Sequence, residues 1–290
     1  MQRDVQKALG FLMPMAIIML GLVFYPIIRT FIFSLQRYKL TEPDKVGFIG
    51  FENYAAVLRS PAFHYAIVNT LLIMGIVLIV GLFSSIVVAL ILYGKTRLSG
   101  LLTAVAVIPW ALPPVVNGVV WKFIFYPGQG FLNKLLYNLD LIDEPVRWLN
   151  TRFGTLLIVG LIVAWRTIPF CAIVFLANMQ SIPQEVYDAA KVDGANSRKT
   201  FLYITMPHLM PSVAIALTNL TMSSINVFDE IAALVGFRNM GQPLLIYNYT
   251  ETFSFMNFGY GSAITYIIMI ASGVFGYFYI RSLHFGGGKS

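Results

Sequence analysis

The side chains that could do chemistry in this chain stand mostly within long apolar runs. One set is spaced by four, three and four residues, as on one face of a helix: Asn219, Ser223, Asn226 and Glu230. Most of these groups offer hydrogen bonds rather than a nucleophile. Such a stripe in an apolar helix either holds helices together or lines a polar path, and the sequence leaves both roles open.

No other arrangement of residues points to catalysis or to a bound metal. The chain has a single cysteine, Cys171, and its histidines and carboxylates do not follow the spacing of metal ligands. The Gly-Lys-Ser at 288–290 has no strand before it and no helix after it, as a phosphate-binding loop would need. We therefore expect a non-enzymatic chain without a cofactor of its own.

Composition predicts an all-α, polytopic membrane protein. Apolar residues make up 58% of the 290 residues and charged ones 11%, and the mean hydropathy is +0.74. A hydrocarbon core of roughly 30 Å takes about 20 helical residues. Six transmembrane helices are predicted within one transmembrane domain over 1–290, near residues 10–33, 66–93, 101–123, 154–178, 209–233 and 262–281. The net charge of +7 is scattered through the loops, which favours a membrane surface over nucleic acid.

Two of these spans carry residues that a uniform apolar helix would not tolerate. Pro109, Pro113 and Pro114 each remove a backbone hydrogen bond, so the third span should be kinked or broken. The kink is either purely structural or shapes a path that Asn117 faces. Arg166, in the fourth span, costs about 2.5 to 3.5 kcal/mol to insert. It should therefore face a cavity or pair with a helix of a partner subunit.

The stretch 183–207 is the one long water-facing, amphipathic segment. Ser181 and Pro183 predict a helix start, and Glu185 and Asp188 follow in its first turns. Gly194 predicts the stop, in a left-handed conformation with positive φ. A basic second arm with Arg198 and Lys199 then leads to Pro207.

This stretch resembles the cytoplasmic Glu-Ala-Ala-x-x-x-Gly loop of ABC-importer membrane subunits. The matching positions are Pro183, Asp188, Ala189, Ala190, Asp193, Gly194, Ala195, Phe201, Ile204 and Pro207. Asp188 departs from the family's usual glutamate but keeps the charge. We call 183–207 the coupling loop, and its expected ATPase-coupling residues are Glu185, Asp188, Ala189, Ala190, Asp193, Gly194, Ala195 and Arg198.

Weaker similarities extend over nearly the whole chain. The Gly-x-x-Asn-Tyr element at 50–54 and the segment 258–263 resemble parts of sugar-type permeases, and maltose-type permeases place substrate contacts at positions matching Arg166, Thr167 and Phe170. Aromatic residues at 247–260 serve either as membrane anchors or as sugar platforms. The expected substrate path comprises Asn117, Arg166, Thr167, Phe170, Ser223, Ser224 and Asn226.

The resemblance implies the permease subunit of an ATP-driven carbohydrate importer in a bacterial or archaeal cell membrane. Its implied partners are a second related permease, two ATP-binding subunits that hold ATP and magnesium, and an external solute-binding protein. Both termini would be cytoplasmic, with the 122–151 loop outside. The alternative is an ion-coupled secondary transporter, which would need intramembrane carboxylates. Only Asp229 and Glu230, near a span end, are available for that role.

Overall fold

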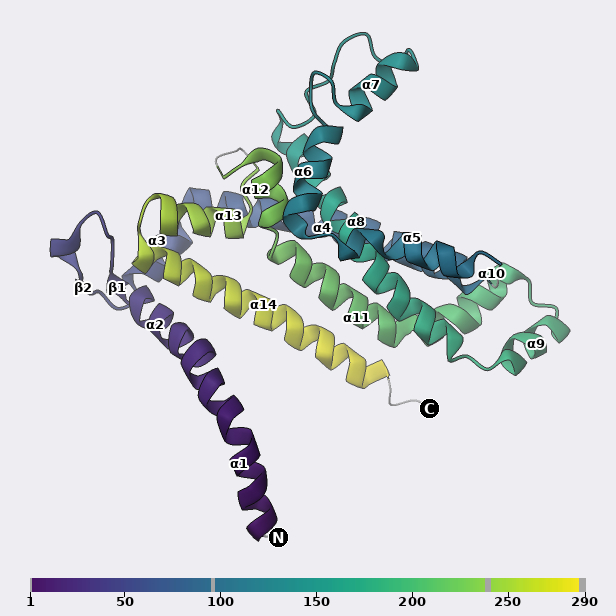
Figure 1. Cartoon of the computed structure of the whole chain (residues 1–290), viewed down its shortest axis with the longest axis horizontal. Coiled ribbons are helices and arrows are strands. Elements are labelled where there is room, and N and C mark those ends of the chain that lie inside the picture. Colours follow the sequence, from purple (N-terminus) through teal and green to yellow (C-terminus); the bar gives the residue numbers. More distant parts are fainter. Residues whose placement is uncertain (1, 95–96, 238–240, 287–290) are drawn as a thin grey trace. The chain divides into compact units, whose positions relative to one another are not determined.

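The computed structural model describes residues 2–94, 97–237 and 241–286, and most of them are helical (Figure 1). The chain forms two compact units, which are treated one at a time. The first comprises Met1–His64 and Asn248–Ile270, and the second Tyr65–Tyr247 and Ala271–Ser290. The single transmembrane domain over 1–290 stays a prediction.

The first unit combines an apolar helical stem with a small strand pair. Its elements are α1 (Gln2–Met19), η1 (Leu20–Phe24), α2 (Tyr25–Ser34), β1 (Gln36–Arg37), η2 (Pro43–Lys45), β2 (Gly47–Phe48), α3 (Glu52–Arg59), η4 (Thr250–Ser254) and the start of α14 (Phe258–Gly286). The strands β1 and β2 are antiparallel, with Gln36 opposite Phe48.

The Gly-x-x-Asn-Tyr element has a structural role in this unit. The buried Asn53 amide donates to the carbonyl oxygens of Ser34 and Gln36, at 2.9 Å each. The Tyr54 hydroxyl lies 2.7 Å from Ser34 Oγ. These bonds fix the chain where α2 passes into β1.

The second unit holds the remaining helices and most of the buried core. Its elements are α4 (Pro61–Tyr93), α5 (Ser99–Ala111), α6 (Pro114–Ile124), α7 (Phe131–Asn138), α8 (Arg152–Gln180), α9 (Gln184–Val192), α10 (Ser197–Thr200), η3 (Phe201–Thr205), α11 (Met206–Ile225), α12 (Asp229–Val235) and α13 (Leu244–Tyr249). α4 begins, and α13 ends, in the first unit.

Helix α8 is the centre of the second unit. It packs against α5 and α11, and Val159, Ile162 and Phe175 on it are fully buried. Gly160 lies so close to Ile76 of α4 that an added Cβ would come within 2.7 Å of that side chain. Small residues let membrane helices approach in this way.

The predicted fold class is confirmed, with five helices long and apolar enough to cross a membrane among the described residues. A sixth span is made if the bent pair α5 and α6 counts as one. The two helices of that pair meet at 98°, and α6 leaves the line of α5 at Leu112 and Pro113 (Figure 1). The prolines of this stretch cause the break, because a proline has no amide hydrogen to continue the helical ladder.

The fifth span differs from the continuous helix predicted over 209–233. Helix α11 ends at Ile225, and α12 begins only at Asp229. The Asn226 side chain donates to the Met222 carbonyl at 2.9 Å, and this local bond helps to end the helix. The polar stripe on one helical face was therefore a wrong prediction, since Glu230 belongs to a separate helix.

Candidate functional site

The coupling loop folds as the sequence predicts around Gly194. Helix α9 ends at Val192, and Gly194 has a φ of +74°. The amide of Ala195 donates to the Ala190 carbonyl at 2.9 Å, and that of Gly194 to the Lys191 carbonyl at 3.0 Å. This pair of bonds is the Schellman motif, which requires a left-handed residue at the Gly194 position.

The start of α9 differs from the prediction. Ser181 does not cap it, since its hydroxyl donates to the Asn178 carbonyl at 2.8 Å and so closes α8. The N-cap position belongs to Pro183, which makes no side-chain capping bond.

The outer face of α9 is polar and open. Glu185, Asp188 and Ala189 are exposed, whereas Ala190 is buried beneath them. Asp188 accepts a hydrogen bond from Lys191 Nζ at 2.9 Å, and this bond, followed by that from Gln184, lowers the pKa of Asp188 below its usual range. The loop therefore presents a carboxylate that stays charged at neutral pH.

The second arm of the coupling loop is one continuous helix with the fifth span. Asn196 caps it by accepting from the Lys199 amide at 2.9 Å. From Ser197 the helix runs through α10, η3 and α11 to Ile225, a length of 29 residues. Arg198 and Lys199 are exposed in its first turn, so a displacement there can be transmitted to Ile225.

A cavity of about 390 Å³ lies behind α9. Its lining comes from α4, α8, α9 and the start of the long helix: Leu90, Tyr93, Met179, Tyr187, Lys191, Ala195, Ser197, Thr200, Phe201 and Thr205. The cavity thus borders α9, the ends of α4 and α8, and the start of the long helix.

Arg166 of α8 pairs with Glu230 of α12 inside the second unit. The Nε atom lies 2.7 Å from Glu230 Oε1, and the side chains are 20% and 3% exposed. The sequence led us to expect that Arg166 faces a cavity or pairs with a helix of a partner subunit. In the structure it pairs with a carboxylate of its own chain. Breaking a buried pair of this kind is costly, because the remaining charge has no compensation.

Phe170 and Thr167, three residues apart on α8, differ in burial and in their contacts. The half-buried Phe170 ring stacks on Trp110 of α5, with centroids 6.4 Å apart and planes at 30°. The buried Thr167 hydroxyl donates to the Val163 carbonyl at 2.8 Å. Thr167 is therefore less accessible than Phe170, and its hydroxyl is bonded to its own helix.

Asn117 of α6 is fully buried, and neither of its side-chain polar atoms has a hydrogen-bond partner in the described part of the chain. The same holds for Nε1 of Trp121, one turn further on. The Trp121 ring meets Trp165 edge to face, with centroids at 5.5 Å. A buried amide without partners costs free energy unless water, substrate or another conformation satisfies it.

The three predicted residues of the fifth span have different surroundings. Ser223 is half-buried on α11. Ser224 is fully buried, and its hydroxyl donates to the Leu220 carbonyl at 2.7 Å. Asn226 is exposed at the break between α11 and α12.

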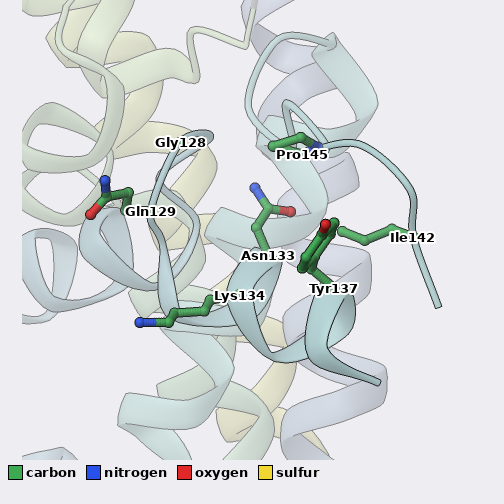
Figure 2. A pocket seen from close by; sticks show the side chains of 7 residues that line it. All are labelled: Gly128, Gln129, Asn133, Lys134, Tyr137, Ile142 and Pro145. Atoms are coloured by element: carbon green, nitrogen blue, oxygen red, sulfur yellow. The ribbon is translucent and has the colours of Figure 1, made fainter. Parts of the chain in front are cut away.

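A second cavity, of about 440 Å³, lies in the loop between α6 and α8 (Figure 2). Its lining residues are Gly128, Gln129, Asn133, Lys134, Tyr137, Ile142 and Pro145. Asn133 holds the loop closed, since its amide donates to Pro127 and Val146 carbonyls and its oxygen accepts from Trp148 Nε1 at 2.9 Å.

Comparison with known proteins identifies the family. The model of the binding-protein-dependent transport system inner membrane component matches residues 79–284. The chain belongs to this family. It is therefore a multi-pass inner-membrane permease, the non-catalytic component of a binding-protein-dependent ABC transporter.

Two sugar-transport permeases match this permease over nearly its whole length. The trehalose/maltose transport system permease protein MalF of Thermococcus litoralis is 32% identical and covers 91% of this chain and 90% of its own length. The sulfoquinovosyl glycerol transport system permease protein SmoG of Agrobacterium fabrum is 33% identical, covering 90% and 85%. The resemblance to carbohydrate-type permeases is thereby confirmed.

The fold agrees with that of a solved transporter. A bacterial ABC transporter involved in the import of the acidic polysaccharide alginate superposes with a TM-score of 0.82 at 22% identity. The match covers 98% of this permease and 96% of that chain.

Sequence reasoning missed Glu230 and Trp110 as neighbours of the predicted path residues. A signal for Glu230 was present, because a buried arginine calls for a carboxylate and only Asp229 and Glu230 lie near a span end. Trp110 had no such signal, since its approach to Phe170 depends on how α5 packs on α8.

Proposed function

We propose that this permease forms half of the translocation path of an ATP-driven sugar importer, the other half coming from a second, related permease. The observation that carries the proposal is the ion pair of Arg166 on α8 with Glu230 on α12, together with the Phe170 ring of the same α8 stacked on Trp110 of α5. Sugars are bound by hydrogen-bonding side chains together with aromatic faces, and both occur here within an apolar unit.

Within this path the predicted residues take different parts. Asn117, Arg166 and Phe170 contact the sugar, and Ser223 and Asn226 line the path near the end of α11. Thr167 and Ser224 shape it indirectly, because their hydroxyls are bonded back to their own helices. Relatives transport trehalose/maltose in one case and import the acidic polysaccharide alginate in another, so kinship leaves the substrate's charge open.

The coupling loop docks on an ATP-binding subunit in the cytoplasm. Glu185, Asp188, Ala189 and Arg198 provide the contact, and Ala190, Asp193, Gly194 and Ala195 hold its shape. Two such subunits, with ATP and magnesium, serve the two permeases. The exposed face of α9 and the continuity of Ser197–Ile225 support this arrangement, in which ATP-driven movement of α9 is passed along one helix to Asn226.

This orientation places both termini in the cytoplasm and the loop between α6 and α8 outside. The solute-binding protein delivers substrate on that outer side. The cavity around Tyr137 lies on the side where it docks.

Reconstitution of the whole complex tests the function. The permease, its partner permease, the ATP-binding subunits and the binding protein are placed in liposomes, and ATP-dependent uptake of radiolabelled sugars is measured. Uptake should require ATP and the binding protein together. Uptake driven by an ion gradient without ATP would contradict the proposal.

A crosslink tests the docking site. A cysteine at Asp188 should crosslink to the ATP-binding subunit, and a matched cysteine at Tyr137 should not, although both positions are exposed. Equal crosslinking from the two positions would contradict the assigned orientation.

A further inference from the structure

The charged residues inside the second unit bear on whether the transported sugar is neutral or anionic. Across the described parts of α4 from Tyr65 onward, α5, α11 and α12, the charged residues are Asp229 and Glu230 alone. Helix α6 adds the exposed Lys122, and α8 adds Arg152 at its first residue and Arg166 near its middle. Arg166 is thus the cation that the proposed path offers at membrane depth.

That cation is already compensated. Glu230 Oε1 accepts from Arg166 Nε at 2.7 Å, and Glu230 is almost completely buried. Asp229, the preceding residue, is half-buried in the same first turn of α12. A guanidinium stays protonated under all ordinary conditions, so its ion pair with Glu230 leaves Arg166 without an uncompensated positive charge.

We propose that Glu230 determines specificity, by neutralising Arg166 and so making the path selective for uncharged saccharides over anionic ones. The inference rests on the proposed function. An entering carboxylate or sulfonate would lose its hydration and find no free cation to compensate its charge, because Glu230 already pairs with Arg166, and this disfavours it. The hydroxyls of a neutral sugar both donate and accept, so they can bind beside the Arg166–Glu230 pair without bringing in a charge.

The close packing of α12 supports a fixed position for Glu230. Helix α12 lies against α6, where a Cβ added to Gly118 would come within 2.6 Å of the Glu230 carbonyl oxygen. Glu230 therefore has no room to withdraw from Arg166 by a shift of its backbone toward α6.

Four proteins test the proposal: the wild type, Glu230→Gln, Arg166→Gln and the double variant. Each is purified as the complete transporter in lipid nanodiscs without the binding protein, so that the path alone selects. Equilibrium binding is measured for neutral oligosaccharides such as maltotriose and for uronic-acid oligosaccharides of the same length.

The wild type should bind neutral sugars in preference to anionic ones. In Glu230→Gln, the ratio of anionic to neutral affinity should rise by about tenfold, and in Arg166→Gln it should fall further. The double variant, with its charge balance restored, should return to within about threefold of the wild-type ratio. A role in packing alone predicts a different pattern, in which both single variants weaken both kinds of sugar alike.

A further variant leaves the ion pair intact. Asp229→Asn should shift the ratio in the same direction as Glu230→Gln but by less, and it serves if Glu230→Gln fails to assemble. Preference of the wild type for anionic sugars, or an unchanged ratio in Asp229→Asn and Glu230→Gln, would overturn the inference. Binding of neither kind of sugar to any of the proteins would instead count against the sugar-importer function.

Discussion

Three buried asparagines show how the residue scale separates structure from function. The amides of Asn53 and Asn133 donate hydrogen bonds to backbone carbonyls. Asn53 thereby fixes the chain between α2 and β1, and Asn133 holds the loop between α6 and α8 closed. Asn117 is as deeply buried, yet its two polar atoms have no partner in the described part of the chain. A structural amide is satisfied in the state it stabilises, so Asn117 is the one whose partner comes with substrate or with another conformation.

Substitution by leucine should separate these roles. In Asn117→Leu the melting temperature of the purified complex should stay the same or rise, because an unpaired polar group is removed, while sugar uptake falls. The matched Asn133→Leu should destabilise the complex by about 1 to 3 kcal/mol, since it leaves buried carbonyls unpaired. A marked loss of melting temperature in Asn117→Leu would show that the amide has a structural partner.

Gly194 offers a second test at this scale. An added Cβ would meet nothing within 4 Å, so a side chain acts only through the positive φ. Gly194→Val should cost about 1 to 2 kcal/mol in this conformation and misdirect the second arm. Sugar transported per ATP hydrolysed should then fall with membrane insertion intact. Gly194→Asn is the control, since asparagine tolerates this conformation, and equal coupling in both variants would contradict the account of the turn.

At the scale of elements, two departures from regular spans shape the proposed path. The third span is broken at 98°, and the fifth is interrupted between Ile225 and Asp229. The two short helices that result, α6 and α12, pack closely on each other. Non-helical backbone at membrane depth is tolerated only where protein or a water-filled cavity satisfies it. The breaks therefore fit helices that border a path.

The contact between α6 and α12 depends on Gly118. An added Cβ would lie 2.6 Å from the Glu230 carbonyl oxygen and 2.7 Å from Ala233 Cβ, so Gly118→Ala should lower stability by about 1 to 3 kcal/mol. Gly75→Ala in α4 meets nothing within 4 Å and should leave the melting temperature unchanged or slightly higher. Thermal unfolding of the purified complex checks both, and equal effects would contradict the close contact.

At the scale of the whole molecule, the sequence predicted what depends on local physics. The long apolar runs predicted the fold class, and the glycine at 194 predicted the end of α9 and its positive φ. The sequence did not reveal which polar groups meet across helices. The Arg166–Glu230 pair joins residues 64 apart in the sequence. The predicted stripe was wrong because the hydrophobicity of 226–233 gives no sign that the helix ends at Ile225. Such contacts depend on packing between distant segments.

Orientation in the membrane is the last property to test at this scale. Thr41 and Ser197 are both exposed, and the native Cys171 is fully buried, so it should not compete for a membrane-impermeant thiol reagent. In intact cells or right-side-out vesicles, a cysteine at Thr41 should be labelled and one at Ser197 should not. In inside-out vesicles the pattern should reverse, because Ser197 opens the long helix of the coupling loop. The wild type, with Cys171 alone, controls for background labelling. Labelling of the Ser197 variant from outside would place α9 away from the cytoplasm and remove the basis for docking an ATP-binding subunit there.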